Sequence, residues 1–161
     1  MKPNLIKRIA LALCVNLFSI SLALSAPYAE GQRVDSFQAK DQFEQPFTFK
    51  PANSKFLLVS HDMETGKKAN AVLSPLGKDY LNSKKAVYMA NIFGMPGVGR
   101  MFAMPKMKKY NHKIILADDA ALIARFPAQA GKVTVLTLAD GKVTSVAYWT
   151  PGKEGIDGFV K

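Results

Sequence analysis

Residues 115–143 read ILADDAALIARFPAQAGKVTVLTLADGKV, and this stretch decides the fold class. It opens with a short apolar strand, after which Asp118 or Asp119 can cap a short helix that Pro127 closes. Two β-branched runs, KVTVLTL and KVTSVAYW, then flank Asp140-Gly141, a strong hairpin signal. A strand, a helix and a closing antiparallel hairpin are together typical of a mixed sheet.

The residues upstream extend this pattern toward the N-terminus. KFLLVS (55–60) and AVYMANI (86–92) are short apolar runs, as expected of strands buried on both faces. Between them, apolar residues recur at helical spacing from near Thr65, and Pro75 should shorten that helix. VDSFQAKDQFEQPFTF (34–49) predicts two strands around a polar corner. We therefore expect a mixed central sheet covered by helices.

Residues 1–25 have the pattern of a signal peptide. Three cations and no acid lie in the first eight residues, followed by an apolar run and small residues at Ser25 and Ala26. The run is interrupted by polar residues and is shorter than the roughly 20 residues of a membrane-spanning helix. We expect cleavage after Ser25, which leaves residues 26–161 as a single domain in the periplasm or outside the cell.

The expected cleavage changes the charge and the chemistry of the chain. Three of the 22 Lys and Arg and none of the 12 acids lie in residues 1–25, so residues 26–161 carry a formal charge of +7. The single cysteine, Cys14, is also removed. The mature chain would then be stabilised by its core without a disulfide, and thiol chemistry and thiolate metal sites are excluded.

These segments together resemble the peroxiredoxin-like branch of the thioredoxin-like proteins. The similarity rests on residues 34–49, on KFLLVSHD (55–62) and on residues 115–143. SHDM near residue 60 and FAMPKMKKY near residue 102 are also similar to a small group of secreted bacterial proteins, some of which carry the label FAD/FMN-containing dehydrogenase. The resemblance implies an α/β, thioredoxin-like fold with a mixed central sheet, flanking helices and a closing antiparallel hairpin.

The chain departs from this resemblance at both redox signatures. Thioredoxin-like enzymes place a Cys-x-x-Cys pair or a nucleophilic Cys where the first buried strand meets its helix, but residues 61–67 read HDMETGK. The family's cis-proline, expected near Lys132, is missing as well. We therefore predict no catalytic residue, and a non-redox binding or accessory protein whose partner is a periplasmic protein or a small ligand.

A flavin-dependent oxidoreductase is the enzyme alternative that the resemblance implies, with FAD or FMN as cofactor. The chain has no G-x-G-x-x-G motif after a strand. GMPGVGR (94–100) places three glycines and an Arg at a predicted helix start, where either an anion site or a plain turn would account for them.

Four consecutive residues, His61, Asp62, Met63 and Glu64, are the candidate ligand-binding residues. They follow the first buried strand, and ligands of open α/β sheets bind beyond the carboxyl ends of the strands. The alternative is structural: Asp62 caps the next helix and His61 packs beside it.

Clustered methionines suggest a Cu(I) site built from Met101, Met104, Met107 and His112, because thioether sulfur is a soft ligand. The alternative is that Met101 and Met104 belong to the core-facing stripe of a helix that starts at Pro96 and is limited by Pro105.

Lys106, Lys108, Lys109 and Lys113 form a basic patch. It could meet an anionic membrane surface or an acidic partner, or it could be a solvated helix end. We expect no nucleic-acid partner for an exported protein.

Overall fold

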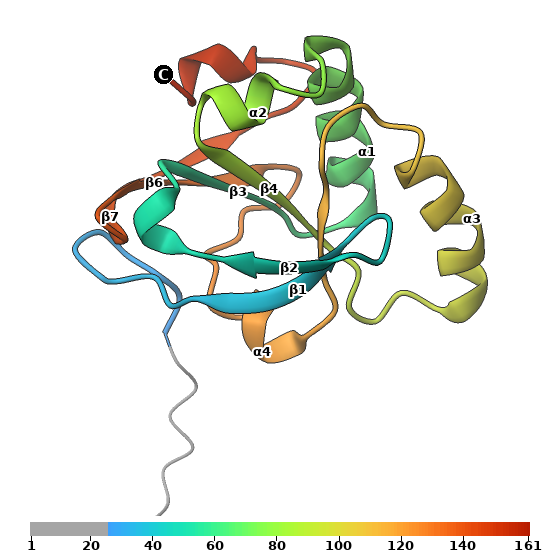
Figure 1. The fold of residues 1–161 in the computed structure, drawn as a ribbon, viewed down its shortest axis with the longest axis horizontal. Helices are drawn as coiled ribbons and strands as arrows, with labels where there is room; N and C mark the ends of the chain where they lie inside the picture. Colours follow the sequence, from blue (N-terminus) through green and yellow to red (C-terminus); the bar gives the residue numbers. More distant parts are fainter. Residues whose placement is uncertain (1–25) are drawn as a thin grey trace, which may run out of the picture.

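The computed structural model describes residues 26–161, in which a seven-stranded mixed sheet is flanked by helices (Figure 1). The predicted signal peptide lies outside the described residues. The strands and helices are β1 (Phe37–Asp41), β2 (Pro46–Phe49), β3 (Phe56–Ser60), α1 (Met63–Leu73), α2 (Tyr80–Ser83), β4 (Ala86–Asn91), α3 (Gly97–Met107), β5 (Ile115–Ala117), α4 (Ala120–Ile123), β6 (Val133–Ala139) and β7 (Lys142–Trp149). Short 3-10 turns span Pro51–Asn53, Ser74–Leu76 and Ile156–Gly158.

The sheet has the strand order β2-β1-β5-β4-β3-β6-β7. Its centre is parallel, because β4 pairs in parallel with both β3 and β5. The outer pairings, β1 with β2 and β5, and β6 with β3 and β7, are antiparallel. The carboxyl ends of β3, β4 and β5 therefore meet at one edge, which is the edge that the sequence singles out at residues 61–64.

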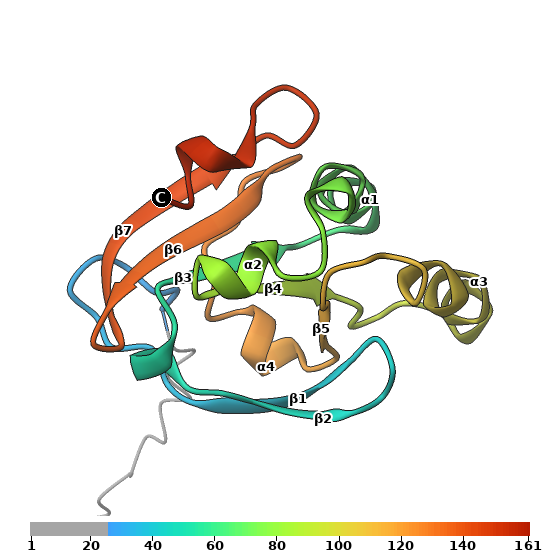
Figure 2. The same cartoon turned by 45° about the horizontal axis from the view of Figure 1, so that its top comes forward.

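Strand alternation divides the core between the two faces of the sheet. In β3, Phe56 and Leu58 face the layer of α1 and α2, whereas Leu57 and Val59 face the layer of α4 and the N-terminal segment. All five residues of β3 are buried, as its apolar run predicts. Figure 2 shows α1 and α2 above the sheet and α4 on its other side.

The first predicted helix begins and ends at residues that its caps explain. α1 starts two residues before Thr65, because the Asp62 side chain accepts the Thr65 N–H and supplies the N-cap. It ends at Leu73, and Pro75, which has no N–H to donate to the carbonyl four residues earlier, follows in a 3-10 turn. The apolar residues beyond it belong to a 3-10 turn and to the short α2.

α3 differs from its prediction in length and in orientation. Pro105 lies inside the helix, which continues to Met107. The missing Pro105 N–H would have bonded the Met101 carbonyl, and Met101 lies on the solvent side, where water can replace that bond. The expectation of a core-facing stripe is wrong for Met101, which is exposed beside Phe102, and it is right for Met104, which packs half-buried against the core.

The C-terminal third follows the sequence closely. Asp140 and Gly141 both have positive φ, 48° and 77°, in the two-residue turn that joins β6 to β7. Trp149 is fully buried, and its Nε1 donates to the Glu154 carbonyl at 2.9 Å. After Pro151 the chain forms the short 3-10 turn at Ile156–Gly158. Within residues 26–161, no helix is long and apolar enough to cross a membrane.

Candidate functional site

The edge where the parallel strands end is tied together by one side chain, that of Asn91. Asn91, the last residue of β4, donates its amide to the His61 carbonyl at 3.0 Å and accepts the Phe93 N–H at 2.9 Å. These two bonds fix the loop after β3 against the loop after β4. The residues that follow β3 and β4 therefore have defined positions at this edge.

His61 lies at this edge, but its ring turns toward the α4 side of the sheet. It continues the alternation of Leu57 and Val59, and its Nε2 lies 3.0 Å from the Thr134 hydroxyl, which in turn donates to the Pro127 carbonyl. Burial lowers the pKa of His61, although the Pro127 carbonyl and the Asp62 carboxylate act in the opposite direction. The ring is therefore held neutral as part of the scaffold.

Asp62 is engaged as the cap of α1. Its carboxylate accepts the Thr65 N–H at 2.8 Å and the Thr65 hydroxyl at 2.7 Å. Desolvation alone would raise the pKa of Asp62, but the bonds from Thr65 and from the Glu64 N–H lower it. Glu64 points into solvent beside Lys68, at 3.6 Å in an exposed ion pair. The Asp62 carboxylate could bind a ligand only by giving up its role as the cap of α1. The Glu64 carboxylate is exposed and points into solvent.

A cavity of about 210 Å³ opens between α1 and α3 at the same edge. Most of its wall is apolar, and Lys67 and Lys106 contribute two cations. Within residues 26–161, no carboxylate forms an ion pair with either ammonium group. The apolar side chains at its wall are Met63, Ala90, Met95, Phe102, Ala103, Met107 and Tyr110.

Two buried polar pairs lie beside this cavity. The hydroxyls of Ser60 and Tyr88 are 3.0 Å apart, and burial raises the pKa of Tyr88. Next to them, His112 Nε2 lies 3.0 Å from Asn70 Oδ1. Ser60 and Asn70 also contribute to the cavity wall, so the interior end of the cavity has polar groups that are already paired with each other.

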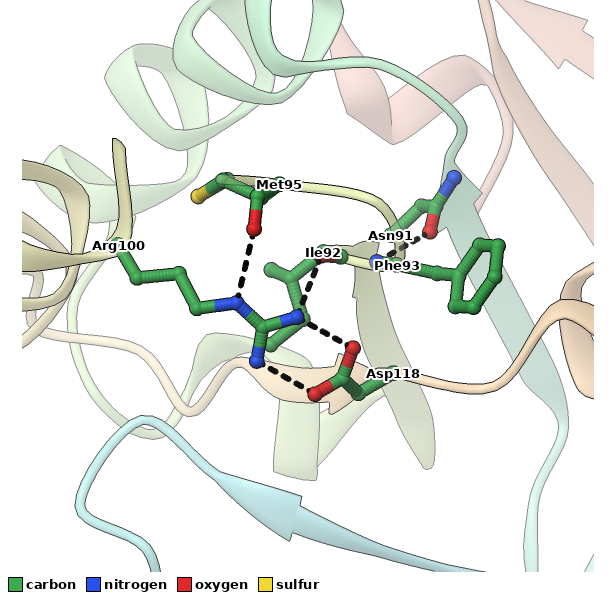
Figure 3. A network of polar contacts seen from close by, with 6 residues as sticks. All are labelled: Asn91, Ile92, Phe93, Met95, Arg100 and Asp118. Carbon is green, nitrogen blue, oxygen red and sulfur yellow. Dashed lines mark hydrogen bonds and ion pairs between the residues drawn. The ribbon is translucent and has the colours of Figure 1, made fainter. Parts of the chain in front are cut away.

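Arg100 fastens the loop before α3 to the end of β5 (Figure 3). Its guanidinium donates two bonds to the Asp118 carboxylate, at 2.5 and 2.6 Å, and one each to the carbonyls of Met95 and Ile92. This ion pair lowers the pKa of Asp118. Because its donors are used within the chain, the GMPGVGR segment has the features of a braced turn and not of an anion site.

The other side of α3 borders a second, wider cleft of about 750 Å³. The cleft lies between α3, the β1–β2 hairpin and the end of β5, and Arg100 and Asp118 line it. Its charged residues have both signs, whereas the smaller cavity is apolar with two cations and the capped Asp62. α3 therefore separates two hollows of different chemistry.

Solved structures of similar shape identify the fold. A thio-disulfide isomerase from Thermus thermophilus is 20% identical, with a TM-score of 0.50 over 81% of this chain and 94% of that one. The peroxidoxin BcpB from Mycobacterium tuberculosis is 14% identical (TM-score 0.51, 81% and 90% covered), and a peroxiredoxin-like protein from Aquifex aeolicus is 12% identical (0.51, 82% of each). The chain has a thioredoxin-like fold. No family model and no curated protein sequence matches it.

The thioredoxin-like fold confirms the fold class that the sequence predicts, and the identities carry nothing beyond the fold. At the position where the resemblance implies a catalytic Cys, the structure places the Asp62 cap and Met63. Residues 26–161 also contain no cis peptide bond. Where the resemblance implies a cis-proline, before β6, the chain uses the contacts of Thr134 with His61 and Pro127.

The candidate residues at 61–64 are neighbours in sequence that the fold separates. Asp62 and Met63 line the cavity between α1 and α3, whereas the His61 ring lies toward the other face and Glu64 pairs with Lys68. The structural alternative, in which Asp62 caps α1 and His61 packs beside it, describes what the structure shows.

The predicted Cu(I) residues are also separated. Met101 and Met104 line the wide cleft, Met107 lines the small cavity, and His112 is 1% exposed and bonded to Asn70, so it presents no open edge. Met63, Met95 and Met107 instead share the small cavity. No three His, Cys, Asp or Glu side chains of the described chain are grouped as a metal site.

The basic patch is exposed, as expected: Lys106 ends α3, Lys108 and Lys109 follow it, and Lys113 precedes β5. Lys106 and Lys108 lie at different hollows, Lys106 at the small cavity and Lys108 at the wide cleft. Lys113 borders a third, shallow hollow near β4 and is not part of either site.

Several residues of the site were not predicted from sequence. Asn91 and Lys67 carry the polar bracing and one cation, and Ser60, Asn70 and Tyr88 form the polar floor. Asn91 has a recognisable signal, because it ends the second buried strand and so must lie beside the end of the first. The others become neighbours only when α1 and α3 pack.

Proposed function

We propose that the protein is a non-redox, thioredoxin-like binding module that acts in the periplasm or outside the cell after removal of residues 1–25. Its binding site is the cavity between α1 and α3. The observation that carries this proposal is an apolar cavity with two cations at the position where thioredoxin-fold enzymes use thiols. The fold provides the site, and the residues at it provide binding groups in place of a nucleophile.

The size and chemistry of the cavity define what it accepts. At about 210 Å³ it is smaller than the roughly 300–1,000 Å³ pockets of drug-sized ligands. It suits one apolar group, either a small ligand or one side chain of a partner polypeptide. Lys67 and Lys106 favour a negative charge on that group or next to it. A small ligand and a partner's side chain would need the same chemistry, which is an apolar group with a negative charge on it or next to it.

A titration with hexanoate, which has a short apolar chain and one carboxylate, tests the site. Residues 26–161 with ¹³C-methyl methionine should show saturable shifts of the Met63, Met95 and Met107 methyls. The Met89 methyl should not shift, since Met89 is fully buried on the other face of the sheet. Shifts that are confined to Met101, or that do not saturate, would contradict the proposal.

A filling substitution separates this cavity from general surface binding. Ala103→Phe should occupy the cavity and abolish the shifts, because Ala103 is a wall residue. Ala71→Phe on the exposed side of α1 is the matched control and should bind like the parent protein. Reduction of insulin disulfides or of a peroxide by residues 26–161 at an enzymatic rate would contradict the non-redox part.

Cu(I) binding is the second candidate function, and one observation favours it. Met63, Met95 and Met107 contribute three thioethers to one small cavity, and thioethers are soft ligands that suit Cu(I). This set replaces Met101, Met104 and His112 as the residues to test. The two functions share a cavity, so bound copper and hexanoate should compete.

A competition titration against a Cu(I) chelator tests the metal proposal. Met63→Leu/Met95→Leu/Met107→Leu should lose binding, and Met101→Leu/Met104→Leu should retain it. Leucine keeps the apolar volume, so the fold should be unaffected. Affinity no tighter than micromolar in the parent protein would sink the idea.

A flavin-dependent reaction is the enzyme alternative, and its cofactor would need an anchor other than Arg100. The Arg100 guanidinium already serves Asp118 and two backbone carbonyls. A visible absorption spectrum of the gently purified protein tests it. Stoichiometric flavin in that preparation would replace the binding proposal with an enzymatic one.

A further inference from the structure

The solvent-facing side of α3 is apolar, which is the reverse of an ordinary surface helix. Val98, Met101 and Phe102 are 66%, 68% and 65% exposed. With the exposed Pro105 they follow the spacing i, i+3, i+4, i+7, so they form one continuous stripe. The opposite side of the helix, at Gly99, Arg100, Ala103, Met104 and Met107, is half-buried against the domain. An apolar stripe of this kind is normally covered.

Lysines lie at the C-terminal end of this stripe, whereas on the side of the wide cleft Met101 and Pro105 share the wall with charged residues of both signs. From Gly97 to Ala117 the chain has no acidic residue. Lys106, Lys108 and Lys109 are exposed at the C-terminal end of α3 and directly after it. Arg100 belongs to the inner side, where Asp118 neutralises it. The C-terminal end of the stripe is therefore complementary to an anionic partner.

We propose that the outer face of α3 binds an anionic lipid membrane surface. An interfacial helix lays an apolar face with Phe and aliphatic side chains into the headgroup region, and lysines at its border contact anionic lipids. α3 is placed for this, because it lies at the outer margin of the molecule (Figure 2). The stripe is on the exposed side of the helix.

The same features argue against a protein as the occupant of the stripe. Lys is depleted at protein–protein interfaces, which favour Arg and aromatic anchors, whereas lysine-rich borders are typical of membrane-surface helices. A second copy of this chain would bring the same acid-free, lysine-rich segments together, which like charges disfavour. Lipid phosphates are anionic and are contacted by lysines, so neither the depletion of Lys nor the repulsion of like charges applies to an anionic membrane surface.

Vesicle flotation of residues 26–161 tests the proposal. The protein should float with equimolar phosphatidylglycerol and phosphatidylcholine vesicles in low salt, and should remain in solution with phosphatidylcholine alone. Lys108→Gln/Lys109→Gln should weaken the partition constant roughly 25-fold, at about fivefold per lysine. Raising the salt to about 0.5 M should weaken it similarly, since screening removes the attraction to the surface.

Substitution of the stripe tests the apolar contribution separately. Val98→Gln/Met101→Gln should reduce vesicle binding at least about tenfold, because two exposed apolar side chains no longer insert. Neither residue lines the cavity between α1 and α3, so hexanoate binding should persist. Leu76→Gln, at another exposed apolar residue, and Lys142→Gln/Lys153→Gln are the matched controls and should float like the parent protein.

The outcomes distinguish the possible occupants. Absence of flotation with anionic vesicles in low salt overturns the proposal, as does binding that neither salt nor the lysine substitutions weaken. A dimer in light scattering that Val98→Gln/Met101→Gln dissociates, without vesicle binding, would assign the stripe to a second copy instead. Circular dichroism and the melting temperature of each variant show that the fold is kept. Loss of hexanoate binding alone leaves this proposal standing.

Discussion

At the scale of single residues, His112 buries a titratable ring with one nitrogen unpaired. Its Nε2 lies 3.0 Å from Asn70 Oδ1, so Nε2 carries the proton, while Nδ1 is a buried acceptor without a partner in the described chain. The rings of Tyr88 and Tyr110 pack around it, with centroids 5.8 Å away. Burial lowers the pKa of His112 to about 4, because a charged imidazolium would be desolvated there.

This burial predicts how stability depends on pH. Between pH 6.5 and about 4 the unfolded chain protonates this histidine and the folded chain does not. The stability present above pH 6.5 is therefore lost as the pH falls to about 4, at up to about 1.4 kcal/mol per pH unit and about 3 kcal/mol in total. Urea unfolding across this range measures it. His61, whose pKa is also lowered, contributes in the same direction.

His112→Gln assigns the effect to this residue. Glutamine keeps an amide that can donate to Asn70 and does not titrate, so the pH dependence should flatten even if the variant is less stable at pH 7. The ring protons of His112 in the parent protein should titrate near pH 4 by NMR. A ring pKa close to 6.5 would contradict the prediction.

At the scale of secondary-structure elements, α3 is held by contacts at its start and by a half-buried side, where Met104 and Met107 pack against the core. None of its residues is fully buried, and Arg100 links its first turn to Asp118 and to the carbonyls of Ile92 and Met95. The attachment of the helix therefore depends in part on a half-exposed ion pair. Both hollows described above have α3 as one wall, so its attachment also controls their shape.

Removal of that link should loosen α3 without unfolding the domain. Arg100→Met should increase amide hydrogen exchange across residues 92–107, while the global free energy of unfolding falls by only about 1 kcal/mol. Lys68→Met, which breaks the exposed pair with Glu64 in α1, is the matched control and should leave exchange in α3 unchanged. Unchanged exchange in Arg100→Met would show that α3 is held by other contacts.

The elements also show how much of the fold can be predicted from sequence. Buried strands and the Asp140-Gly141 hairpin have local signals, and both were predicted close to their observed bounds. The orientation of α3 could not be predicted, because Val98, Met101 and Met104 make it apolar on more than one side, so periodicity does not identify the packed face. Pro105 falls on the solvent side, where its missing N–H is tolerated.

The candidate site was predicted in its location and not in its composition. Parallel strands place their carboxyl ends together, and for this reason residues 61–64 were predicted as ligand-binding residues. Alternation along β3 sends the His61 ring to one face while α1 holds Asp62 on the other. Partners such as Lys67, from α1, and Tyr110, from the loop after α3, are brought together by packing that has no local sequence signal.

At the scale of the whole molecule, residues 26–161 share one sheet whose two faces carry the core. Trp149, the single tryptophan, is fully buried in the cluster that also holds Phe56 and Tyr88. It ends the last strand and contacts the chain after it through Glu154. Its environment therefore reports on packing between the ends and the middle of the chain.

This architecture predicts cooperative unfolding of residues 26–161. Tryptophan fluorescence and far-ultraviolet circular dichroism should give coincident urea transitions, because no part of the sheet has a separate core. Added dithiothreitol should not shift the midpoint, since this part of the chain has no cysteine. Two separate transitions would contradict the single-domain prediction.

The cap of α1 has a consequence for any attempt to engineer thiol chemistry at this edge of the sheet. Asp62 and Thr65 have the spacing of a Cys-x-x-Cys pair, and they bond each other through the backbone and the hydroxyl of Thr65. Installing cysteines at these two positions would remove the Asp62 carboxylate and the Thr65 hydroxyl, and it would leave the backbone N–H of residue 65 in the first turn without its carboxylate acceptor. A Cys-x-x-Cys pair therefore cannot be installed at these two positions without weakening the cap of the helix that would present it.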